Sequence, residues 1–189
     1  ISPGLINPHD HITYANNTPI GDGVDRYEHR HDWRIGLGGH ADVPYNSGAS
    51  NAVVQAAELR FVMSGATSAA SAGGRAGLLR NLDGSSAQLE GLPVQQADSD
   101  TFPLDDANGT MHEMGCNYGN NATTNADIAG LDGYLPHIAE GIDLAARNEF
   151  VCTSMGATDL IEPQTAVIHA IGVLPEDAAE MATENTKVK

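Results

Sequence analysis

Two histidines that lie two residues apart, His9 and His11, are the first residues of this chain whose types and spacing indicate chemistry. They follow a mostly apolar segment, residues 1–7, that is typical of a β-strand. In an extended segment, residues i and i+2 project to the same face, so we expect the two imidazoles to converge while Asp10 points away. Catalytic zinc prefers such nitrogen donors and takes three protein ligands and a water. The pair therefore predicts part of a metal site, with two plain surface histidines as the alternative.

A second His-x-His pair, His29 and His31, is a rival candidate for metal binding. No apolar strand precedes this pair to hold it in place. Arg30 and Arg34 lie beside it in the sequence, and their positive charges disfavour a cation. We therefore expect these histidines to face a substrate or to order the loop around them.

Three further residues with chemical potential lie in the last third of the chain. His137 and Glu140 form a His-x-x-Glu pair after an apolar segment, and His169 ends another apolar segment. Histidine can bind a metal or act on water, and a carboxylate can pass a proton to a leaving group. The structural alternatives are a core histidine at 169 and, at 140, an acid in the first turn of a helix.

Strand-like and helical segments alternate along the chain and must position these residues. Val53, Ala57 and Phe61 lie four apart, which predicts a helix that Ser50 can cap. The alternation predicts an α/β fold with a parallel sheet. We expect helices over 51–63, 76–82, 123–133 and 142–150 and from Pro175, strands over 64–71, 94–102, 111–118 and 164–169 and from Tyr134, and a long loop over 14–49.

The segment from Pro3 to His11, Pro-Gly-Leu-Ile-Asn-Pro-His-Asp-His, closely resembles the first-strand signature of the amidohydrolase superfamily. The later residues resemble the order found in its aminohydrolase branch, which includes cytosine and guanine deaminases and triazine hydrolases. That order is His-x-His, then His-x-x-Glu after strand five, then a histidine after strand six. The resemblance implies a (β/α) barrel of the TIM type.

The resemblance also implies a role for each matched residue. His9, His11 and His137 would be the ligands of one divalent metal ion, zinc with iron as the alternative. Glu140 would carry a proton between metal-bound water and the leaving group. His169 would orient or deprotonate the water and polarise the substrate.

Two family features have no counterpart in this sequence. Some relatives bridge two metals with a carboxylated lysine from strand four, but the only lysines here are Lys187 and Lys189, so we expect a single metal. The family also completes its site with an aspartate at the end of strand eight, and no residue here matches it. We expect strands seven and eight on sequence beyond this chain, which puts the activity of the chain by itself in doubt.

The length of 189 residues is short of the roughly 250 that a complete eight-stranded barrel needs. About six of the eight βα units can be counted. We therefore expect residues 1–189 to form a single incomplete barrel domain without the β-sandwich that relatives usually build. An open barrel leaves two strand edges unpaired, so we expect homo-oligomerisation, strand swapping or a compensating change in layout.

The chain carries 25 acidic and 9 basic side chains, a formal net charge of −16, which argues against nucleic acid or an anionic membrane surface as a partner. No charged leader or long apolar run is present, so the default expectation is the cytoplasm, with export if a leader was removed. Cys116 and Cys152 can form one disulfide.

Together these features predict metal-dependent hydrolysis of a carbon–nitrogen, non-peptide bond in a small-molecule substrate. The substrate would be a cyclic amide, an amidine-like heterocycle or an acyl amino acid. The alternative is a non-catalytic fragment that binds metal through its histidines. The loops over 14–49 and 103–126 carry no signature that identifies the substrate.

Overall fold

The computed structural model describes residues 3–21, 25–70, 73–92 and 97–188. The chain folds into two compact units. The first unit comprises residues 1–20 and 45–99, and the second unit comprises residues 21–44 and 100–189. Among the helices of the described part of the chain, none has the length and apolar character needed to cross a membrane.

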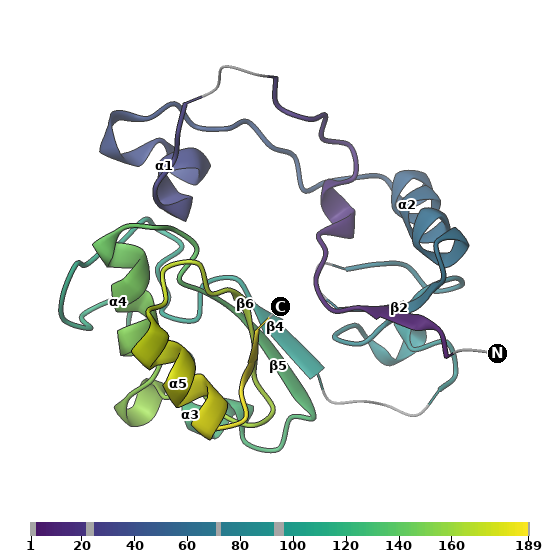
Figure 1. The fold of residues 1–189 in the computed structure, drawn as a ribbon. Helices are drawn as coiled ribbons and strands as arrows, with labels where there is room; N and C mark the ends of the chain where they lie inside the picture. The colour runs from purple at the N-terminus through teal and green to yellow at the C-terminus, as the bar shows by residue number, and fades with distance from the viewer. Residues whose placement is uncertain (1–2, 22–24, 71–72, 93–96, 189) are drawn as a thin grey trace. The chain divides into compact units, whose positions relative to one another are not determined.

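The first unit contains a parallel three-stranded sheet with the order β1-β2-β3. Leu5 pairs with Ala66 and Asn7 pairs with Ala69, and the helix α2 lies beside β2 (Figure 1). The helical elements of this unit are η1 (Ile12–Tyr14), α2 (Asn51–Met63) and η3 (Ser86–Gln88), and its strands are β1 (Leu5–Asn7), β2 (Ala66–Ala69) and β3 (Arg80–Asn81).

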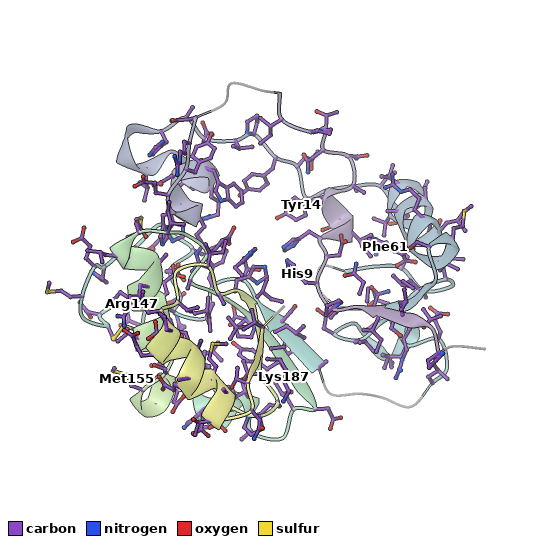
Figure 2. All side chains as sticks on the ribbon, viewed as in Figure 1. His9, Tyr14, Phe61, Arg147, Met155 and Lys187 are labelled. Carbon is purple, nitrogen blue, oxygen red and sulfur yellow. A yellow bond between two sulfur atoms is a disulfide. The ribbon has the colours of Figure 1, made fainter. Side chains whose placement is uncertain are left out.

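Helix α2 begins and ends where the apolar spacing predicts. Val54 and Ala57 are buried in a core with Ile12 and Leu79, and Phe61, labelled in Figure 2, packs against the same core. Ser50 occupies the N-cap position, but its side chain makes no capping hydrogen bond. Apolar burial therefore positions this helix more than its cap does.

The helix predicted over 76–82 is wrong. Gly77 has φ 119°, which is incompatible with a right-handed helix, and Arg80 and Asn81 form strand β3 instead. Asn81 is buried, and its side-chain amide donates to the carboxylate of Glu58 and to the carbonyl of Leu79. The tertiary environment, which pairs this segment with β2, overrides the local helix preference.

The second unit contains most of a four-stranded sheet with the order β4-β5-β6-β7. The pairs β5–β6 and β6–β7 are parallel, with His137 opposite Ile168 and Ala166 opposite Lys187. The strands are β4 (Ala97–Asp100), β5 (Gly133–Ile138), β6 (Ala166–His169) and β7 (Lys187–Val188), and the helical elements are α1 (Arg30–Ile35), η2 (Leu37–Gly39), α3 (Asn125–Ile128), α4 (Leu144–Cys152), η4 (Gly156–Thr158) and α5 (Pro175–Thr183).

Helices α4 and α5 of this unit lie side by side (Figure 1). Arg147, labelled in Figure 2, donates from Nη2 to the carboxylate of Asp177 at 3.2 Å and so joins the two helices. Asp143 caps α4 by accepting from the backbone N–H of Ala146. The core beneath them contains Ile138, Phe150, Val167 and Met181.

Two expectations for the second unit are wrong and one is too long. The loop over 14–49 contains the helix α1, and the stretch 111–118 contains no strand. This stretch is held instead by the Cys116–Cys152 disulfide and by the side-chain amide of Asn148, which donates to the carbonyl of Gly115. The helix predicted over 123–133 shortens to α3, because Gly130 turns the chain with φ 100°.

The α/β class and the parallel pairing are confirmed, since both sheets contain parallel pairs and a helix lies between β1 and β2, between β5 and β6 and between β6 and β7. Strand β7 is an element that the sequence did not predict. Its Lys187, labelled in Figure 2, donates to the backbone carbonyls of Pro163 and Asn185. The structure contains two small sheets, and the closed curve of a barrel stays a prediction.

Candidate functional site

His9 and His11 follow β1 in the first unit. The strand ends at Asn7, so both residues lie in the segment beyond it (His9 is labelled in Figure 2). The backbone N–H of His9 donates to the side chain of Asn7, and that of His11 donates to the side chain of Asp10 at 2.7 Å. The two rings lie 4.7 Å apart, centroid to centroid, and perpendicular to each other.

Both histidines of this pair are set to be neutral. Burial lowers the pKa of His9, and the neighbouring His11 lowers it further. Burial also lowers the pKa of His11 against the opposing effect of Asp10. A metal ion binds imidazole only through a nitrogen without a proton, so neutral rings suit the predicted ligand role.

In the second unit, His137, Glu140 and His169 meet where β5 and β6 end; we call them the strand-end group. His169 lies opposite Ile138 in the parallel register, which brings its ring within 5.2 Å of the His137 ring, centroid to centroid. His169 Nε2 is 3.4 Å from Glu140 Oε2. Parallel strands thus collect residues that are 32 positions apart in the sequence at one edge of the sheet.

The tautomer of neutral His137 follows from its hydrogen bond. Its Nδ1 lies 3.1 Å from the backbone carbonyl oxygen of Asp100. Because a carbonyl only accepts, Nδ1 must carry the proton, and the lone pair lies on Nε2. Metal-binding histidines commonly have this arrangement, with one ring N–H donated to a carbonyl.

Glu140 has an unusual affinity for a proton. Burial raises the pKa of Glu140 to about 7, against the opposing charge of Arg30, and Glu149 raises it further. The first-turn alternative for Glu140 is wrong, because α4 begins at Leu144 after its cap Asp143. His169 is 28% exposed on its side chain and faces Glu140, which does not fit a core histidine.

The backbone at this edge is strained. Ala139 has φ 56°, His169 has φ 77° and Ala170 has φ 51°, all in the left-handed region that residues with side chains seldom adopt. Such conformations persist where surrounding contacts hold them, and they cluster at functional sites. The positions match the ends of the two strands that carry the strand-end group.

His29, His31 and Glu149 form a fully buried group in the second unit. One ligand atom from each lies within 4.8 Å of the others, so these residues could hold a metal ion, of which the structure does not define the identity. His29 also caps α1, because its ring accepts from the backbone N–H of His31 at 3.1 Å. His29 thus orders the loop, as the sequence predicts.

Arg30, Asp106 and Glu149 are the site residues that sequence reasoning missed. Arg30 Nη2 lies 2.5 Å from Asp106 Oδ2 and 3.1 Å from Glu149 Oε1, and all three side chains are at most 2% exposed. Burial raises the pKa of Asp106, but its hydrogen bond with His31 and the charge of Arg30 outweigh burial and leave the pKa below its ordinary value. The sequence does point to Glu149, because a charged residue there falls on the same face of the helix as the apolar Ala145 and Cys152.

The first unit therefore brings His9 and His11 together, and the second unit brings His137, Glu140 and His169 together. The common metal site of His9, His11 and His137 stays a prediction. Searches against protein-family models, curated proteins and solved structures found no match to this chain. The family resemblance accordingly stays a prediction that rests on the residues themselves.

Proposed function

We propose that this chain belongs to a metal-dependent hydrolase of the amidohydrolase type that cleaves a carbon–nitrogen, non-peptide bond. The substrate would be a small molecule, either a cyclic amide, an amidine-like heterocycle or an acyl amino acid. His9, His11 and His137 would bind one divalent ion, zinc or iron. Glu140 and His169 would supply the proton transfers.

The observation that carries this proposal is the pairing of Glu140 with His169 at the ends of two adjacent parallel strands, beside His137. A carboxylate and an imidazole 3.4 Å apart can each exchange a proton with a substrate or water held beside both of them. Barrel enzymes place their reacting groups at this end of their strands. The placement of Glu140 and His169 at strand ends is consistent with the proposed partial barrel of about six units.

The donor set fits a divalent metal ion. His9 and His11 have lowered pKa values, and His137 presents its Nε2 lone pair because Nδ1 donates to Asp100. Three imidazoles with a fourth position for water are typical of catalytic zinc. When bound, such an ion lowers the pKa of its water toward about 7.

Glu140 and His169 would then do complementary work. With a pKa of about 7, Glu140 accepts a proton and returns it to the departing nitrogen with little cost at neutral pH. His169, held against Glu140, would orient the attacking water and polarise the bond to be broken. Neither role needs a lysine, and Lys187 on β7 donates to the backbone carbonyl of Pro163 instead.

The test is a turnover screen of zinc- and iron-loaded protein against cyclic amides, amidine-like heterocycles and acyl amino acids, with Glu140→Gln beside wild type. We expect the substitution to lower kcat by about 10²- to 10⁴-fold, the range for a general acid–base group. Glu184→Gln, an exposed position after α5, is the matched control and should retain activity. Turnover that survives Glu140→Gln unchanged would remove the proton-transfer role.

The second candidate function is metal binding without chemistry. It requires only that the histidines bind a metal ion and that no reaction follows. Protein that binds zinc through His9, His11 and His137 but turns over none of these substrates would support it.

We also propose that unpaired strand edges lead this chain to self-associate. Light scattering measures the mass of the assembly directly.

A further inference from the structure

Arg30 is the most buried cation of the second unit, and its contacts converge on one turn of the backbone. Its side chain is 2% exposed, and Nη1 donates to the carbonyl of His137 at 3.3 Å and to that of Thr101 at 2.8 Å. Its backbone N–H donates to the carbonyl of Glu140 at 3.0 Å. Arg30 therefore binds both ends of the turn that joins His137 to Glu140.

Glu149 holds the middle of the same turn. Its Oε2 accepts from the backbone N–H of Ala139 at 3.0 Å, and its Oε1 lies 3.1 Å from Arg30 Nη2. Ala139 is the residue with φ 56°, a conformation that needs outside contacts to persist. Arg30 and Glu149 together thus bind three polar groups of a strained backbone, the carbonyls of His137 and Glu140 and the N–H of Ala139.

We propose that Arg30 is a positioning residue: paired with Glu149, it holds the backbone between His137 and Glu140 so that the Glu140 carboxylate faces His169. This inference rests on the proposed function for the roles of Glu140 and His169. Burying an ion pair seldom adds stability, because desolvation offsets the attraction between the charges. Fixing a reactive geometry explains why a full charge is kept at this depth.

The rival interpretation is a metal ion among His29, His31 and Glu149. His29 Nε2 and Glu149 Oε1 are 3.2 Å apart but are not aligned as a hydrogen bond, as expected of atoms that share a cation. Arg30 already places a positive charge 3.1 Å from Glu149 Oε1, where a metal ion bound by that oxygen would be repelled. The ring of His31 is also engaged, by Arg34 at Nδ1 and by Asp106 at Nε2.

Arg30→Lys tests the proposal while keeping the positive charge. A lysine cannot reproduce the guanidinium fork that joins the turn to Glu149. We expect the folded variant to lose hydrogen-exchange protection at the Ala139 amide while amides of α5 stay protected. If the enzyme is active, kcat should fall by up to about 10²-fold with KM unchanged, the loss typical of a misplaced reacting group.

Arg34→Lys is the matched control, because Arg34 lies on the same helix and contacts His31 and Ala107 rather than the turn. It should leave Ala139 exchange as in wild type. Exchange at Ala139 that is unchanged in Arg30→Lys would overturn the proposal. So would protection lost equally across α5, because that result indicates general destabilisation.

Arg30→Met is the third variant and removes the charge. The titratable groups that face Glu140 are Arg30 on α1, His29 at the N-cap of α1, Glu149 on α4 and His169 on β6, and the side chain of Trp33 also hydrogen-bonds to it. Loss of the positive charge should raise the pKa of Glu140 above about 7, which carbon NMR of its carboxyl group measures without any substrate. If this variant does not fold, the exchange result of Arg30→Lys decides.

Zinc titration of the full chain provides the remaining control. The proposal expects His29→Ala to leave the zinc stoichiometry unchanged. Loss of one zinc per chain in that variant would overturn the proposal in favour of a metal at His29. Absence of turnover in wild type would instead count against the proposed function and leave the exchange and NMR results as the test of Arg30.

Discussion

The histidine pair of the first unit and the strand-end group of the second unit are held in place by different means. His9 and His11 are fixed by side chains of Asn7 and Asp10, which lie within two residues of them. His137 and Glu140 are fixed by Asp100, Arg30 and Glu149, which come from distant segments. Neighbouring side chains thus contribute to the placement of the histidine pair, whereas the placement of the strand-end group depends on contacts between segments that are far apart in the sequence.

The largest expected effect separates metal ligands from the residue that acts on water. His9→Ala, His11→Ala and His137→Ala should each lower zinc affinity by more than the 10- to 100-fold typical of losing an outer hydrogen-bond partner. His169→Asn should spare zinc affinity and lower the rate. Calorimetric zinc titration beside rate measurement checks this. Equal loss of zinc in His169→Asn and His137→Ala would make His169 a ligand.

The next largest effect is expected from the disulfide, which lies wholly in the second unit and should therefore stabilise that unit and not the first. Cys116 and Cys152 are 36 residues apart and close a loop of that length. Replacing both with Ser should lower the free energy of unfolding by about 2–4 kcal/mol, chiefly by freeing the unfolded chain. Urea unfolding measures the change in the free energy of unfolding, and hydrogen exchange of the native protein shows which unit loses protection. Amides of α2 in the first unit should keep their protection, and a uniform loss across both units would contradict this.

A pH effect of similar or smaller size should come from Glu140. Its pKa in the folded state is raised to about 7 by burial, from 4.5, against the opposing charge of Arg30 and with added repulsion from Glu149. The stability that its bound proton provides is therefore complete below about 4.5 and is lost as the pH rises through 7, by at most about 3 kcal/mol.

Metal-free protein unfolded in urea between pH 4.5 and 8 measures this contribution, with Glu140→Gln as the reference. His29 and His169 also face Glu140, so the difference between the two proteins, rather than either curve alone, isolates its titration. We expect the free energy of unfolding of wild type to fall relative to Glu140→Gln across this range. A constant difference would mean that Glu140 titrates normally.

The smallest expected effect on stability comes from the helix caps, of which one in each unit can be compared. Asp143 accepts from the N–H of Ala146 at 2.7 Å, whereas Ser50 makes no side-chain bond at the start of α2. Asp143→Ala should lower the free energy of unfolding by about 1 kcal/mol, and Ser50→Ala should change it by much less. Thermal and urea unfolding of both variants test the difference, and equal losses would contradict it.

The sequence by itself determined the elements whose burial pattern is local. The four-residue spacing of Val53, Ala57 and Phe61 predicts α2, and short apolar runs predict β5 and β6, because these patterns are visible within each segment alone. The α/β class follows from that alternation. The close approach of His9 and His11 was likewise predicted from their two-residue spacing.

Only the tertiary structure decided how Glu140 is held. Nothing near it in the sequence predicts that Arg30, 110 residues earlier, binds its turn or that Glu149 holds the left-handed backbone at Ala139. The same limit explains the failed helix over 76–82, where pairing with β2 outweighs local preference. The physical reason is that burial of a charge and long-range backbone pairing depend on which segments meet, and local spacing carries no record of those contacts.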